Sequence, residues 1–186
     1  MDEATNQTQQ KVPDIRANFN PATPYRSYSN DEWNIKEMWY TEELLKLQMP
    51  PIPTSADIRA YSVEIEKLLT TARIDYAFIK QNFEEYDSIM DAMEKRLFLE
   101  LKTNPPVILS GLKMTVDEIK GAVIQHLQNT AFKKGLSIFS IVTVSRRRNT
   151  FMDNVVKALV EKRENIVTHI TLNKQDAMGG GPIGQP

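Results

Sequence analysis

Residues 58–101 read IRAYSVEIEKLLTTARIDYAFIKQNFEEYDSIMDAMEKRLFLEL, and this stretch decides the fold. Apolar or small residues recur through it from Ile58 to Leu101 with a mean spacing of about 3.6 residues. That period is the repeat of a nearly straight α-helix, and neither proline nor glycine interrupts it. The pattern predicts one helix roughly 70 Å long. Because so long a helix is not stable alone in water, it must pack against other elements.

Proline breaks delimit this helix on both sides. Pro50-Pro51-Ile52-Pro53 precedes it, and Thr54 or Ser55 can cap its first turn. Asn104-Pro105-Pro106 follows it, and proline is incompatible with a continuing helix. The helix is therefore expected to begin near Thr54 and to end at Asn104.

A second long helix is predicted after the connection. Thr115 and Glu118 have the spacing of a capping box, in which each side chain bonds the other residue's backbone amide. An apolar row then continues from Ile119 to Ile170. We therefore expect a mainly α fold, in which two long antiparallel helices form a helical hairpin domain over residues 54–172.

Residues 136–144, LSIFSIVTV, are the weak part of the second helix, because β-formers dominate there. A strand without a partner leaves its backbone unpaired, so helix is favoured, with a kink near Gly135 as a fallback and strand still open. The stretch is apolar on nearly every side and is expected to be buried in a subunit interface. The predicted interface residues within it are Ile138, Phe139, Ile141 and Val142.

The two ends of the chain differ from the helical hairpin in composition. Residues 1–29 are rich in Gln, Asn, Thr, Ser and Pro and are expected to form a disordered or extended arm. Residues 30–53 should form a short helix followed by a Pro-rich linker. Its tryptophans, Trp33 and Trp39, favour a hydrophobic clasp onto the main body or a neighbouring subunit over a stacking platform for bases. Residues 173–186 are expected to be a flexible Gly-rich tail.

Composition excludes several classes of function. The chain has no cysteine, so it has neither disulfides nor thiolate metal ligands. Its 2 histidines, His126 and His169, lack a metal-ligand spacing, and no nucleophile elbow or phosphate-binding loop is found. We therefore expect no enzyme, no cofactor, no metal and no small-molecule substrate. Without a leader or a long apolar run, the expected location is the cytoplasm, with no membrane contact.

Charge is distributed unevenly along the chain. Residues 1–114 hold 13 Lys and Arg against 18 Asp and Glu, whereas residues 115–186 hold 10 against 6. Basic residues at intervals of 14 would share one face of a continuous helix, about 21 Å apart, and could bind phosphates. A solvated face, or a partner for the acidic first helix, explains the same charges. The residues of this basic row are Lys120, Lys134, Arg148 and Lys162.

The run Ala72-Arg73-Ile74-Asp75-Tyr76 resembles a motif of the recombination mediators of T-even phages, the UvsY family. Thr71 stands where the family motif has a lysine. The resemblance implies a helical protein that forms an oligomeric ring and binds single-stranded DNA. It also implies that the protein helps load a recombinase onto strands covered by single-strand-binding protein, and that Arg73 contacts the DNA.

The leading hypothesis is therefore an oligomeric, single-stranded-DNA-binding mediator of phage recombination, acting in the cytoplasm of a bacterial host. Its expected partners are single-stranded DNA, a recombinase, single-strand-binding protein and further copies of the chain, with Trp33 and Trp39 also at the subunit interface. The alternatives are a helical scaffold protein of a phage particle and an adaptor whose arginines bind an acidic protein. The predicted DNA-binding residues are Arg73, Lys80, Lys133, Lys134, Arg146, Arg147, Arg148 and Lys157.

Overall fold

The computed structural model describes residues 19–24, 29–50, 53–104 and 114–179, except for the side chains of residues 169 and 172–179. The structure is mainly helical, as expected. Most of the predicted arm (1–18 and 25–28), Pro105-Pro106 and the end of the tail (180–186) lie outside the described residues. The elements are, in order, α1 (Asn30–Lys46), α2 (Ser55–Thr103), α3 (Val116–Asn129), β1 (Ala131–Lys133), β2 (Leu136–Ser137) and α4 (Ile138–Gly179).

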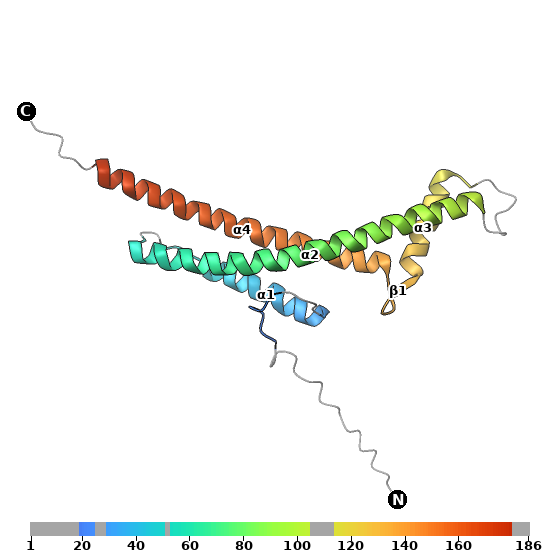
Figure 1. Cartoon of the computed structure of the whole chain (residues 1–186), viewed down its shortest axis with the longest axis horizontal. Coiled ribbons are helices and arrows are strands. Elements are labelled where there is room, and N and C mark those ends of the chain that lie inside the picture. The colour runs from blue at the N-terminus through green and yellow to red at the C-terminus, as the bar shows by residue number, and fades with distance from the viewer. Residues whose placement is uncertain (1–18, 25–28, 51–52, 105–113, 180–186) are drawn as a thin grey trace, which may run out of the picture.

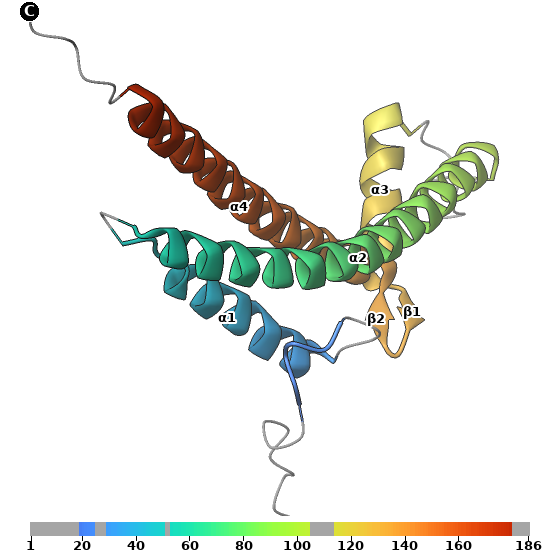
Figure 2. The same ribbon diagram turned by 60° about the vertical axis from the view of Figure 1, so that its left-hand side comes forward.

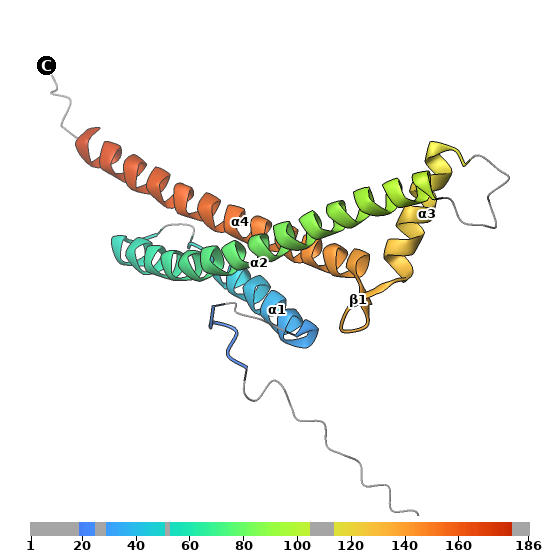
Figure 3. The same cartoon turned by 45° about the vertical axis from the view of Figure 1, so that its right-hand side comes forward.

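The two longest helices, α2 and α4, run in opposite directions and cross (Figures 1 and 3). Helix α2 begins at the predicted cap, where Thr54 and Asp57 form a capping box, and it continues without a break for 49 residues. Helix α1 lies along its first half, whereas α3 lies beside its far end (Figure 1). The predicted capping box of Thr115 and Glu118 is confirmed at the start of α3.

The prediction of one continuous second helix is wrong between residues 130 and 137. There the chain forms an antiparallel hairpin in which Ala131 pairs with Ser137 and Lys133 with Leu136 (Figure 2). Helix was favoured over strand for residues 136–144 because no partner strand was expected, and β1 supplies that partner for Leu136 and Ser137. From Ile138 onward the favoured helix is confirmed. Helix α4 starts at Ile138 and reaches Gly179, so it continues beyond the predicted end at residue 172.

The first half of α2 is buried by two neighbouring helices. From α2, Ile65, Leu69 and Ala72 are 0% exposed, and they pack with Met152 and Leu159 of α4, which are also 0% exposed. Helix α1 adds Trp33, Tyr40 and Leu47 to the same core. The tryptophan segment is therefore a clasp onto this chain's own body, one of the two clasps that the sequence favoured.

The second half of α2 is covered more thinly. A smaller core of Ile119, Val123 and Leu127 from α3, with Ile138 and Val142 from α4, packs against it. The α2 residues on this side, which run from Phe83 to Leu101, are only half-buried. The periodic stripe of α2 thus continues past the point where its neighbours cover it completely.

A buried charge cluster fastens α1 to α2. Lys36 and Asp75 are both 0% exposed, with Lys36 Nζ 2.6 Å from Asp75 Oδ2. Tyr40 donates its hydroxyl hydrogen to the same oxygen at 2.5 Å, and Lys36 also donates to the carbonyl of Thr23 at 2.5 Å. Burial lowers the pKa of Lys36, and the hydrogen bond and charge of Asp75 oppose that shift. The cluster joins the segment before α1, α1 itself and α2.

Replacement of Asp75 by Ala should destabilise the fold strongly. It leaves the buried ammonium of Lys36 without its carboxylate, and breaking such a pair costs about 3–5 kcal/mol in the free energy of unfolding. Urea denaturation followed by tryptophan fluorescence measures this loss, because Trp33 lies in the same core.

The matched control is the double variant Lys36→Met/Asp75→Leu, which removes both charges and keeps apolar volume. It should recover most of the stability that Asp75→Ala loses. If Asp75→Ala alone proves as stable as the unmodified chain, the ion pair does not hold α1 in place.

Candidate nucleic-acid interface

A cavity of about 460 Å³, called here the hairpin groove, lies where the β-hairpin meets three helices. Helix α1 contributes Asn30 to it, and α2 contributes Asn82 and Tyr86. Among the described residues that line it are three cations and no carboxylate. The other lining residues are Lys133, Lys134, Leu136, Ser140, Ile141, Val144, Ser145 and Arg148.

The hairpin turn positions the two lysines of the groove. Lys134 has φ 51° and Gly135 φ 76°, so both residues of the turn are in the left-handed region. Two-residue turns with both central φ values positive match the twist of the flanking strands. Ser137 then accepts a hydrogen bond from the backbone amide of Ser140 at 3.2 Å, which caps the start of α4. The turn is thus tightly defined, and it presents Lys133 and Lys134 at its tip.

Lys133 contacts an aromatic ring of α2. Its Nζ lies 5.5 Å from the centroid of the Tyr86 ring and donates to the tyrosine hydroxyl at 3.0 Å. This hydrogen bond raises the pKa of Lys133, so the ammonium is charged at neutral pH. A phenol is not a counter-ion, and the positive charge of Lys133 is therefore not neutralised by its contact.

Arg148 approaches the groove from α4. It donates to Asn30 Oδ1 at 2.7 Å, and its guanidinium lies 5.2 Å from the centroid of the Trp33 ring. Both contacts are to neutral groups of α1. Within the described residues, Lys133, Lys134 and Arg148 make no ion pair, so no carboxylate contacts these three cations directly. Glu85 acts on Lys133 only through its charge, which is one of the smaller causes that raise the pKa of this lysine.

Other predicted DNA-binding residues lie on a different flank. Lys80 follows Arg73 by seven residues, so the two are only about 20° apart around α2, whereas Tyr86 is turned about 120° from Lys80. Lys80 pairs with Glu84 at 3.8 Å, and Lys157 pairs with Asp153 at 2.6 Å. The structure therefore divides the eight predicted residues instead of bringing them together.

Carboxylates of α1 and α2 neutralise two of the three consecutive arginines. Arg146 lies 3.3 Å from Asp87, and Arg147 lies 3.3 Å from both carboxylate oxygens of Glu37. These pairs match the reading in which the basic half of the chain is a partner for the acidic helix. The predicted basic row at intervals of 14 residues is wrong, because the hairpin interrupts the helix between Lys120 and Arg148.

The five-residue run that carries the family resemblance has three inward residues. Ala72 and Asp75 are 0% exposed, and Tyr76 donates its hydroxyl hydrogen to Asp153 of α4 at 3.2 Å. Arg73 is exposed, and in the described part of the chain it makes no ion pair. Most of the run therefore holds α2 to its neighbours, and only Arg73 offers a charge to solvent.

The residues predicted to form a subunit interface lie mostly inside the chain's own core. Trp33, Ile138 and Val142 are at most 3% exposed, and Trp39 and Ile141 are half-buried. Phe139 is 38% exposed, and Leu136 of the hairpin is 50% exposed. A subunit contact at this stretch would therefore rest mainly on Phe139, and oligomerisation stays a prediction.

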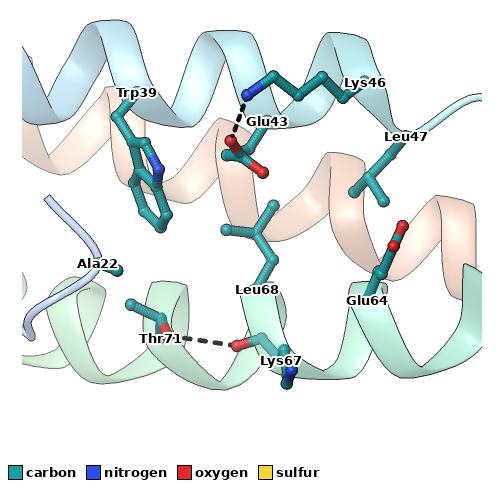
Figure 4. A pocket seen from close by; sticks show the side chains of 9 residues that line it. All are labelled: Ala22, Trp39, Glu43, Lys46, Leu47, Glu64, Lys67, Leu68 and Thr71. Carbon is teal, nitrogen blue, oxygen red and sulfur yellow. Dashed lines mark hydrogen bonds and ion pairs between the residues drawn. The ribbon is translucent and has the colours of Figure 1, made fainter.

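A second cavity is a different kind of site. It measures about 640 Å³ and lies between α1 and α2, with Trp39 and Leu68 pointing into it (Figure 4). Lys46 and Lys67 line it together with Glu43 and Glu64, and Lys46 pairs with Glu43 at 2.7 Å. Its charges are balanced, so it has no preference for an anionic ligand.

The described residues contain neither a metal-ligand cluster nor a membrane-spanning helix. No group of three or more His, Cys, Asp and Glu side chains that could hold a metal ion occurs among them. No helix in the described part of the chain is both long and apolar enough to cross a membrane.

Comparison of the chain with protein-family models, with curated proteins and with solved structures finds no match. The candidate interface therefore rests on the geometry of the chain itself.

Sequence reasoning missed several residues of the groove. Tyr86 belongs to the apolar row of α2, so its position in the sequence predicts core packing. Nothing in the sequence pairs Tyr86 with Lys133, because 47 positions separate them.

Two substitutions in the turn should distinguish how backbone strain and the loss of a charge each affect the free energy of unfolding. Gly135→Ala places a Cβ on a left-handed residue and should lower the free energy of unfolding by about 1–2 kcal/mol. Lys134→Asn should leave stability within about 0.5 kcal/mol, because Asn tolerates this conformation. Urea denaturation measures both values, and equal losses in the two variants would show that the turn is not as described.

Proposed function

We propose that this protein is an oligomeric single-stranded-DNA-binding mediator that helps a recombinase load onto DNA. The supporting observation is the hairpin groove, with Lys133, Lys134 and Arg148 on its walls and no lining carboxylate among the described residues. Neutralisation of phosphates by such cations releases counterions and gives binding that is independent of sequence and sensitive to salt.

The resemblance of residues 72–76 to the phage mediators supplies the recombination context of this proposal. Arg73 contributes a second, separate cation on the opposite flank of α2. Loading of a recombinase onto strands covered by single-strand-binding protein follows from the resemblance alone. The DNA-binding part rests independently on the charge of the groove.

A helical scaffold protein is the second candidate, and one observation favours it. Glu37, Asp87 and Glu66 form ion pairs with Arg147, Arg146 and Arg163, so much of the positive charge of α4 is used within the chain. A scaffold protein would assemble in the same way with or without DNA. Its assembly is best tested after removal of residues 1–18, since α1 belongs to the core.

The DNA-binding proposal predicts a specific change in salt dependence. Anisotropy titrations of a labelled oligothymidylate, at about 50 mM and about 200 mM salt, should show binding that weakens as salt rises. The variant Lys133→Gln/Lys134→Asn removes two phosphate contacts and should reduce the slope of log K against log salt by about 1.4. Absence of binding by the unmodified chain at low salt would contradict the proposal.

The matched control is Lys95→Gln/Lys102→Gln, which removes the same charge from exposed positions of α2 away from the groove. It should leave the slope unchanged. Arg73→Gln tests the opposite flank. A slope that falls in Arg73→Gln but not in the groove variant would move the binding site to that flank.

The proposed role in assembly has a test of its own. Sedimentation of the chain alone and with the oligothymidylate should show an oligomer that binds DNA. An oligomer whose size and stability ignore the DNA, together with flat titrations, would favour the scaffold function.

A further inference from the structure

We infer that the hairpin groove is a seat for one unpaired base, which stacks on the ring of Tyr86 while Lys133 and Lys134 hold the neighbouring phosphates. This inference deepens the proposed function and rests on it. It assigns a distinct role to an aromatic residue outside the run that resembles the phage motif.

Tyr86 is suited to stacking by its position. Its half-buried side chain lines the cavity and also packs against the second core, which holds the ring in place. Over the ring lies an exposed lysine, Lys133, with its Nζ 5.5 Å from the centroid. A base could replace that ammonium on the ring, and Lys133 could turn to a phosphate instead. A base on an aromatic face is held by stacking, which every base can provide.

Apolar surface inside the groove gives the base a second contact. Leu136 is 50% exposed and Val144 is 41% exposed, and both line the cavity with Ile141. These side chains expose hydrocarbon to water in the free protein. A flat base inserted between α2 and the hairpin would cover them, which favours binding.

Besides its three cations, the groove is lined by neutral polar groups that both donate and accept hydrogen bonds. Asn82 carries an amide, and Ser140 and Ser145 carry hydroxyls. Such groups can bond the edge of any base and impose no strong sequence preference. The volume of about 460 Å³ lies within the range of about 300–1,000 Å³ that is typical of small-ligand pockets.

The arrangement predicts discrimination against paired bases. In a duplex each base is stacked and hydrogen-bonded, and it must be flipped out before it can enter a cavity. The cations of the groove can still contact a duplex backbone from outside. The contribution of Tyr86 should therefore appear with single strands and vanish with duplex or abasic strands.

The experiment compares Tyr86→Leu, which removes the ring, with Tyr86→Phe, which keeps it. The probes are an oligothymidylate of about 12 nucleotides and the same strand with abasic sites. The unmodified chain and Tyr86→Phe should bind the base-containing strand on the order of ten-fold more tightly than the abasic strand. In Tyr86→Leu this ratio should fall to about one, with the abasic affinity unchanged.

A second measurement uses the unmodified chain and does not depend on the folding of a variant. An oligonucleotide that contains 5-iodouracil is cross-linked by light, and the modified peptide is identified by mass spectrometry. Attachment at Tyr86 is the expected result. Attachment only at other aromatic residues, or a base-to-abasic ratio unaffected by Tyr86→Leu, would overturn the inference.

The two proposals fail in distinguishable ways. If the chain binds the base-containing and abasic strands equally and in a salt-dependent manner, the DNA-binding function stands and the base seat does not. If it binds neither strand at low salt, the proposed function itself is wrong.

Discussion

The length of α2 is the constraint on which the rest of the structure depends. Its apolar stripe runs through 49 residues, and none of the helices that the structure describes lies against all of it. Helices α1 and α4 bury the first half, whereas α3 and the start of α4 cover the second half less completely. After α2 the chain turns back through α3, and the β-hairpin then leads it into α4, which runs opposite to α2 (Figures 1 and 3). The groove forms where these elements meet, so its position follows from how α2 is covered.

The Lys36–Asp75–Tyr40 cluster shows how a short motif can carry structure. Within the run from Ala72 to Tyr76, one residue packs in the core and two bond to neighbouring helices. Most of the run that carries the resemblance therefore holds α2 to its neighbours, and only Arg73 exposes a charge to solvent. The charge of the hairpin groove supports the proposed nucleic-acid binding independently of this motif.

Periodicity predicted α2 from the sequence because the helix has many turns, so one residue that departs from the apolar pattern changes the mean spacing little. The cap at Thr115 was predicted from side-chain chemistry alone. The hairpin was not predicted because its strands contain only three and two residues, which is too short for an alternating strand pattern to be recognised. The predicted basic row at intervals of 14 residues required an unbroken helix, and the hairpin interrupts that helix. Nothing in the sequence pairs Lys36 with Asp75, since only the fold brings the two residues together. Tyr86 was missed for the same reason, because its hydrogen bond is with a lysine 47 positions away.

The arginine triplet is the most conspicuous basic feature of the sequence, yet consecutive helical residues are turned about 100° from one another. Arg146 therefore meets Asp87, Arg147 meets Glu37, and only Arg148 reaches the groove. A phosphate that binds either of the first two must displace a carboxylate, and the freed carboxylate then repels the DNA. A phosphate in the groove displaces no carboxylate among the lining residues. Whether a basic surface of this chain is suited to a polyanion thus depends more on the carboxylates that already contact its cations than on the number of cations.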